Sequence, residues 1–159
     1  MKKILLLTAL TTVLLGVGQA RAHCEIPCGI YGDEMRFDMM AEHSQTIEKS
    51  VREIKRLSKA KQKDLHQIAR WVQNKELHAE KIQQIISQYF MHQRIKVVSD
   101  SKSKQYQPYL QQLALAHQVA VAAMKNKQAA DLSRVESLRQ AIGNFRLNYL
   151  GPGKSGHHH

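Results

Sequence analysis

The sequence has few of the residues that break or cross-link a chain. Three prolines and eight glycines are spread over 159 residues, and the only two cysteines are Cys24 and Cys28. A disulfide between them would close a very small loop, which removes little entropy from the unfolded chain. A disulfide would therefore stabilise the fold little, and the presence of the two cysteines needs another explanation.

Aromatic residues are also scarce, at 6% of the chain. They do not alternate with basic residues, as a stacking platform for single-stranded nucleic acid would require. We therefore expect no nucleic acid partner, although 24 basic and 13 acidic residues give a formal net charge of +11. Such a charge suits a small anion steered by the field of the protein, or simply a well-solvated surface.

Long apolar runs are absent except at the N-terminus. Lys2 and Lys3 precede the apolar residues 4–18, and Ala20-Arg21-Ala22 has the small-x-small pattern of a cleavage site. This order predicts a secretory signal peptide over residues 1–22, whereas an uncleaved anchor would need a longer apolar run. We expect signal peptidase to remove it, giving an exported protein, periplasmic or extracellular, without stable membrane association. The remaining 21 basic and 13 acidic residues give a charge of +8.

Most of the chain that follows has the periodicity of helices, and no segment shows sustained strand alternation. Asp33, Asp64 and Asp131 each stand where they can cap a helix, and apolar residues then recur at spacings of three and four. Polar stretches separate the helices, at 58–64, 96–105 and 126–131. The sequence predicts an all-α fold, an antiparallel up-and-down four-helix bundle.

Each predicted helix has an apolar face. The expected core residues are Met40, Ile47, Val51, Ile54 and Leu57; Leu65, Ile68, Val72, Ala79, Ile82, Ile86 and Tyr89; Tyr106, Leu110, Leu113, Ala120 and Met124; and Leu132, Val135, Leu138, Ile142, Phe145 and Tyr149. Lys75 and His117 interrupt two of these faces, and Trp71 is expected in the core. No histidine pair has helical i, i+4 spacing, so the following are expected on the surface or in packing: His43, His66, His78, His92 and His117.

Residues 23–31, HCEIPCGIY, bring together groups that bind metals. Removal of the signal peptide would free the α-amine of His23 beside its imidazole and the thiolates of Cys24 and Cys28. The amine, the Cys24 amide and two thiolates could form a square plane, which suits Ni(II) or Cu(II). The His23 imidazole could then be an axial ligand, and Tyr31 could cover the open face of the metal.

This segment resembles the nickel hook of nickel-containing superoxide dismutases, His-Cys-x-x-Pro-Cys-Gly-x-Tyr. All six specified residues are present: His23, Cys24, Pro27, Cys28, Gly29 and Tyr31. The resemblance implies one nickel ion per subunit, bound by the amine and imidazole of His23, the amide and thiolate of Cys24, and the thiolate of Cys28. It further implies that His23 and Tyr31 are catalytic, with Tyr31 lining the anion pocket. It also implies a cis Ile26–Pro27 peptide bond and assembly into a homohexamer.

The implied activity is superoxide dismutation, in which a Ni(II)/Ni(III) centre converts superoxide to dioxygen and hydrogen peroxide. Two alternatives stay open at this point. The chain could be an exported carrier that binds nickel or copper without turnover. It could also be a helical bundle with an incidental disulfide between its two cysteines.

The expected organisation has four parts: signal peptide 1–22, nickel-binding hook 23–33, four-helix bundle 34–150, and tail 151–159. We expect the tail to be disordered, and its three histidines are either an added tag or a natural metal-binding sequence. The motif does not fix the groups beside the His23 imidazole. Candidates for that position are Asp38 or Glu42, and Arg36 or His78.

Overall fold

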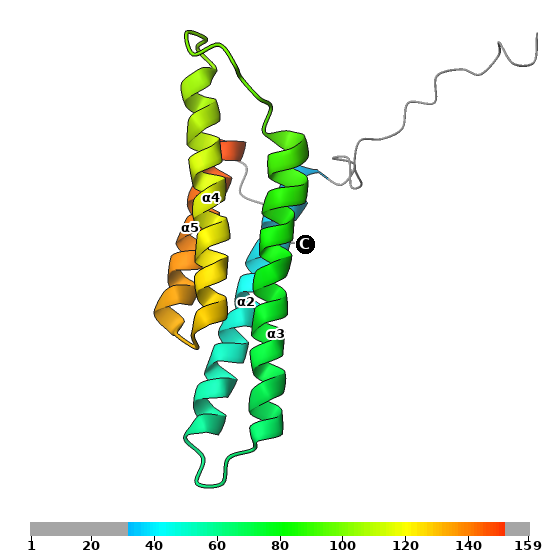
Figure 1. Ribbon diagram of the computed structural model, residues 1–159, viewed down its shortest axis with the longest axis vertical. Helices are drawn as coiled ribbons and strands as arrows, with labels where there is room; N and C mark the ends of the chain where they lie inside the picture. Colours follow the sequence, from blue (N-terminus) through cyan, green and yellow to red (C-terminus); the bar gives the residue numbers. More distant parts are fainter. Residues whose placement is uncertain (1–31, 152–159) are drawn as a thin grey trace, which may run out of the picture.

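The computed structural model describes residues 32–151, which form four helices and contain no strand (Figure 1). The helices are α2 (Asp33–Ser58), α3 (Leu65–Gln84), α4 (Tyr106–Gln128) and α5 (Leu132–Leu150), and a π-helix, η1 (Ile85–Arg94), continues α3. The predicted all-α four-helix bundle is confirmed. Within this part of the chain, no helix is long and apolar enough to cross a membrane.

The helices pack in a ring of antiparallel neighbours. Helix α2 contacts α3 and α5, and α4 contacts the same two helices from the other side. The hairpin of α2 and α3 extends beyond the hairpin of α4 and α5 at the end that holds residues 59–64 (Figure 1). The opposite end brings together the start of α2, the end of η1 and the end of α5. The chain before residue 32 joins the bundle at this second end.

Two of the three predicted helix caps are confirmed. The Asp64 carboxylate accepts a hydrogen bond from the backbone N–H of Gln67 at 3.0 Å, and Asp131 accepts one from Ser133 at 3.0 Å. The prediction for Asp33 was wrong. Gly32 is the N-cap of α2, with φ of 77°, and no side chain caps this helix. The Asp33 carboxylate is instead engaged by donors from other elements.

Aromatic rings fill the end of the core nearest the start of α2. The centres of the Phe37 and Phe90 rings lie 4.9 Å apart, and Phe145 lies 5.2 Å from Phe37 and 4.9 Å from Phe90. The Tyr149 ring packs against all three. Such tilted and edge-on pairs stabilise the core beyond the area that they bury. This cluster joins α2, η1 and α5, and its members Phe37 and Phe90 were not in the predicted core.

The predicted core residues are buried in some helices and exposed in others. The first and fourth helices bury most of the expected residues, but the start of α3 does not: Leu65 is 71% exposed and Trp71 is only half-buried. The expectation that Trp71 lies in the core was therefore wrong. The start of α3 belongs to the part of the α2–α3 hairpin that extends past α4 and α5, where fewer helices cover it (Figure 1).

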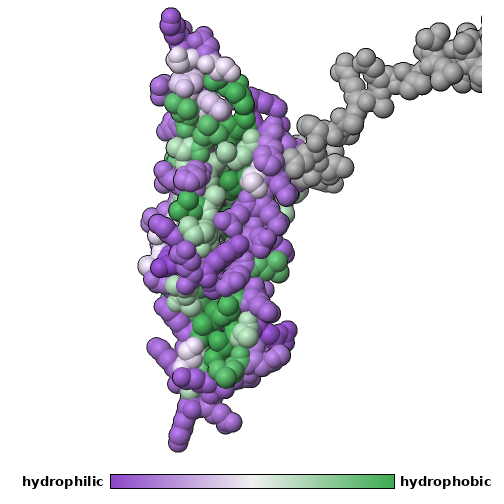
Figure 2. Space-filling view, in the orientation of Figure 1, coloured by the Kyte–Doolittle hydropathy of each residue, from purple (hydrophilic) through white to green (hydrophobic). Residues whose placement is uncertain are grey.

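In the third helix, the buried residues differ from the predicted ones. Helix α4 buries Ala116, Val119, Ala123 and Asn126, whereas Leu110 is 38% and Met124 is 37% exposed. His117, predicted to interrupt the apolar face, lies on the exposed side. The small alanine side chains allow neighbouring helices to approach closely, so the bulkier residues lie at the edge. Figure 2 shows apolar residues gathered in a band between polar flanks on one face of the bundle.

Lys75 is buried, with 2% of its surface exposed. Its ammonium group donates hydrogen bonds to the backbone carbonyl oxygens of Asn126 and, at 2.8 Å, of Lys127. Burial lowers the pKa of this lysine. The last carbonyl groups of a helix have no partner within it, so Lys75 caps α4 from the neighbouring helix.

We predict that Lys75→Met lowers the free energy of unfolding by about 1–3 kcal/mol, because it leaves buried carbonyl oxygens without a donor. Urea unfolding followed by circular dichroism measures the loss. Lys61→Met is the matched control, since Lys61 is exposed in the loop between α2 and α3. Equal stability of the two variants would contradict the capping role.

Candidate metal centre

The first residue of α2, Asp33, receives hydrogen bonds from three side chains of other elements. The Tyr89 hydroxyl donates to Oδ1 at 2.6 Å, and the Tyr149 hydroxyl donates to Oδ2 at 3.1 Å. The Arg94 guanidinium binds both oxygens, through Nε and Nη2, at 2.8 Å each. One carboxylate therefore joins the start of α2 to η1 and α5. We call these four residues the Asp33 cluster.

The π-helix places two of these donors side by side. In an α-helix, residues five apart differ by about 140° around the axis, so Tyr89 and Arg94 would point in different directions. In η1 the hydrogen bonds span five residues, as in the bond from the Ile95 N–H to the Phe90 carbonyl at 2.8 Å. Residues five apart then share a face, and both side chains reach Asp33. Short π-helical segments are frequent at functional sites.

The charges of the Asp33 cluster are mutually stabilised. Burial alone would raise the pKa of Asp33, but hydrogen bonds from Arg94 and Tyr89 outweigh it and lower the pKa. Burial and the hydrogen bond to Asp33 raise the pKa of Tyr89 to about 12, and burial followed by the charge of Asp33 raises that of Tyr149. At neutral pH, Asp33 is thus an anion and both tyrosines remain protonated donors.

The sequence contained a partial signal for this cluster. Tyr89 and Tyr149 both stand on predicted core faces, and a buried tyrosine hydroxyl usually needs a partner. Neither the π-helix nor the approach of Arg94 could be read from the spacing, because both depend on how η1 packs against α2. The cluster was therefore missed.

Four candidates for the surroundings of the His23 imidazole lie in different places. Asp38 pairs with Arg146 at 2.6 Å, and Glu42 is exposed on α2. The Arg36 guanidinium lies 4.9 Å from the centre of the Tyr89 ring, beside the Asp33 cluster. His78 faces His43 across α2 and α3, with their Nδ1 atoms 3.1 Å apart. Of the four, Arg36 is thus the one that lies beside the Asp33 cluster.

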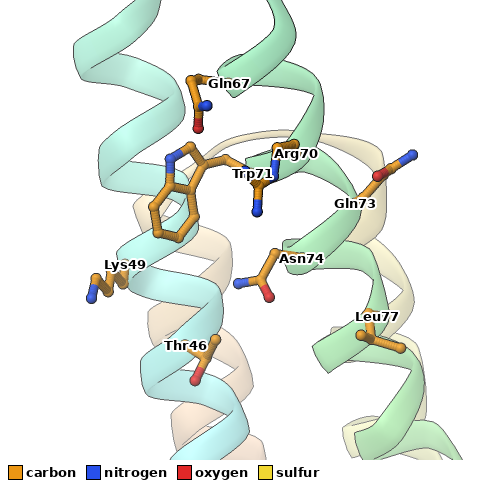
Figure 3. Close-up of a pocket in the computed structure, with 8 residues that line it drawn as sticks. All are labelled: Thr46, Lys49, Gln67, Arg70, Trp71, Gln73, Asn74 and Leu77. Atoms are coloured by element: carbon orange, nitrogen blue, oxygen red, sulfur yellow. The ribbon is translucent and has the colours of Figure 1, made fainter.

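A surface hollow lies on the α2–α3 hairpin, away from the Asp33 cluster. It has a volume of about 690 Å³ and is lined by residues such as Lys49, Gln67 and Trp71. Figure 3 shows the Trp71 ring reaching from α3 towards α2, with Lys49 beyond it. No histidine, cysteine or carboxylate is among its lining residues. This hollow is thus not a candidate metal site.

The hook itself lies outside the described residues: His23, Cys24, Cys28, Tyr31 and the Ile26–Pro27 bond, like the signal peptide and residues 152–159. In residues 32–151, no three histidine, cysteine, aspartate or glutamate side chains are grouped to hold a metal ion. The donor set of residues 23–28 does fit nickel. Thiolates are soft ligands, imidazole suits nickel, and amine and amide nitrogens favour the tetragonal geometry of Ni(II).

Comparison with known proteins agrees with this donor set. A family model for nickel-containing superoxide dismutase matches residues 18–151, which include the whole hook and the whole bundle. The chain belongs to this family. It is an oxidoreductase that acts on superoxide and uses nickel as its cofactor. No curated protein and no solved structure matches the chain.

We predict that Asp33→Asn lowers the free energy of unfolding by about 1–3 kcal/mol, because the charge that pairs with Arg94 is lost while the tyrosine donors stay partly buried. Thermal and urea unfolding of the two proteins measure the difference. Asp38→Asn is the matched control, since Asp38 is on the same helix, has one ion pair and is 53% exposed. A loss no larger than that of the control would contradict the tethering role of Asp33.

Proposed function

We propose that residues 23–31 form the catalytic nickel hook after removal of residues 1–22. The observation that carries the proposal is the complete motif, with all six specified residues, directly after a small-x-small cleavage pattern. Cleavage after Ala22 would make His23 the first residue. The proposed ligands are the amine and imidazole of His23, the amide and thiolate of Cys24, and the thiolate of Cys28.

Bound nickel would supply a one-electron Ni(II)/Ni(III) couple, which lets two superoxide ions and two protons become dioxygen and hydrogen peroxide. The chain has to bind the anion, orient it and keep the thiols from oxidation. We assign the first two tasks to Tyr31, whose hydroxyl can donate a hydrogen bond to superoxide. Peroxide oxidises free thiolates stepwise to sulfenic, sulfinic and sulfonic acids. Coordination to nickel would protect the thiolates of Cys24 and Cys28 from this reaction.

The Asp33 cluster supports this assignment through the covalent chain. Two residues span at most about 7 Å, so Tyr31 is tied to a point that Arg94, Tyr89 and Tyr149 hold by hydrogen bonds. A hook attached to this point would always join the bundle at the same place. We infer that the cluster is the base on which the hook is positioned.

The surface of the bundle favours an anionic substrate and an oligomer. The proposed mature chain has a charge of +8, and such a field raises the encounter rate with a small anion in a salt-dependent way. Large apolar side chains are exposed on several helices, including Met35 at 46%, Leu77 at 50% and Leu147 at 60%. Contiguous exposed apolar surface often marks a protein interface. Assembly into a homohexamer is proposed from the resemblance to the family, and these exposed side chains are available for contacts between subunits.

We further propose that the mature enzyme acts outside the cytoplasm, in the periplasm or extracellular space. The support is the sequence of residues 1–22, with its basic start, apolar run and cleavage pattern. Signal peptidase would then be the maturation enzyme, because its cut creates the amine of His23.

We predict that Cys24→Ser and Cys28→Ser each abolish dismutase activity while far-UV circular dichroism stays unchanged, since no cysteine lies in the described bundle. Activity is measured by the decay of superoxide after pulse radiolysis, together with the nickel content of each variant. Tyr31→Phe should keep its nickel and lose part of its activity, and Tyr106→Phe, at the start of α4, is its control.

Two results would contradict the proposal. Substantial activity in either serine variant would show that the thiolates are not required. A parent protein that binds nickel but does not accelerate the decay of superoxide would indicate a metal carrier.

A further inference from the structure

A second pair of metal-binding side chains lies within the bundle, away from the hook motif. His43 on α2 and His78 on α3 face each other with their Nδ1 atoms 3.1 Å apart. Their ring centres are 4.9 Å apart, and the ring planes are inclined by 78°. The two residues are far apart in sequence, and the packing of α2 against α3 brings them together.

These two distances allow the imidazoles to share a metal ion. Zinc lies about 2.0–2.1 Å from a histidine nitrogen, and a ring nitrogen lies about 1.1 Å from the ring centre. If both rings point at one ion and their nitrogens are 3.1 Å apart, their centres should be about 4.8 Å apart. The observed separation is 4.9 Å. The two nitrogens are therefore close enough for one ion to contact both without a rearrangement of the helices.

The surroundings keep both imidazoles in the form that binds metals. Burial is the main cause that lowers the pKa of His43 and of His78, so both are neutral at pH 7. His43 also lines a cavity of about 300 Å³, together with Met39 and Gln84. Two cationic residues, Arg36 and Lys81, also line this cavity.

Two nearby charges oppose each other at this pair. The carboxylate of Glu42 acts to raise the pKa of both histidines, and the ammonium group of Lys81 acts to lower them. A cation bound here would be attracted by Glu42 and repelled by Lys81. The charge of Lys81 thus sets the affinity of the pair without supplying a ligand.

We propose that His43 and His78 bind a divalent transition-metal ion of the class that imidazole prefers, such as Zn(II), Ni(II) or Cu(II), as a second site separate from the nickel hook. The protein supplies two ligands, and water completes the coordination. The ion links α2 to α3. The alternative is a hydrogen bond between one protonated and one unprotonated imidazole nitrogen, with no ion bound.

The test uses the full chain with Cys24→Ser and Cys28→Ser and with the three terminal histidines replaced by serine. These changes remove the competing thiolates and the terminal imidazoles. Thermal unfolding is measured at fixed protein concentration and pH 7.5, with and without excess Zn(II). An ion that binds only the folded state stabilises it, so we expect the Tm of this parent to rise by about 2–6 °C.

His43→Gln and His78→Gln, made in the same background, should each lose this rise. His117→Gln is the matched control, because His117 is exposed on α4, and it should keep the rise. Lys81→Gln removes the repelling charge and should need a lower concentration of Zn(II) for the same rise. The Tm without Zn(II) shows for each variant that the bundle is folded.

Imidazole NMR provides the second measurement, which does not depend on the stability of any variant. Zn(II) should shift the ring ¹⁵N resonances of His43 and His78 in the parent and leave those of His117 unchanged. The proposal is overturned if Zn(II) does not raise the Tm of the parent, if it raises the Tm of the His43 and His78 variants equally, or if these two rings do not respond. Because the hook thiolates are absent, none of these outcomes bears on the proposed dismutase activity.

Discussion

The carboxylate of Asp33 is the point on which the geometry of the functional end depends. Both of its oxygens accept hydrogen bonds from Arg94, and it also accepts hydrogen bonds from the hydroxyl groups of Tyr89 and Tyr149. These contacts hold together the first residue of α2, the last residue of η1 and the end of α5. Charge-assisted and bidentate hydrogen bonds are the stronger kind. The end of the bundle that carries the hook is therefore fixed by polar contacts over an aromatic core.

This arrangement links the core to the chemistry. Phe37, Phe90 and Phe145 pack directly beneath the cluster and fix the relative positions of α2, η1 and α5. The π-helix places Tyr89 and Arg94 on one face. Gly32, which precedes α2, has a positive φ of 77°, a backbone conformation that residues other than glycine rarely adopt. In the proposed hook, a fixed point of attachment would favour nickel binding. Residues 32–33 therefore lie where the described bundle meets the segment that contains the proposed hook.

The sequence was sufficient for the fold and the family but only partly for the site. Periodicity predicted four helices, and Asp64 and Asp131 capped two of them as expected, because these features depend on neighbours a few residues away. Asp33 does not cap its helix, because its carboxylate accepts hydrogen bonds from side chains distant in sequence and not from nearby backbone N–H groups. The core face of α4 differs from the predicted one, because the packed helix buries Ala116, Val119, Ala123 and Asn126 in place of the bulkier residues at 110 and 124. His43 and His78 gave no helical spacing to recognise, and only the pairing of two antiparallel helices brings them together.

The central claim is that a processed N-terminus at His23 binds the catalytic nickel. The most direct test is intact mass spectrometry combined with metal analysis of the mature protein, purified from cells supplied with nickel. The account predicts a chain that begins at His23, with both thiols reduced and one nickel ion per subunit. A chain that begins elsewhere would lack the amine ligand. A chain that begins at His23 with no nickel and with a Cys24–Cys28 disulfide would also contradict the account.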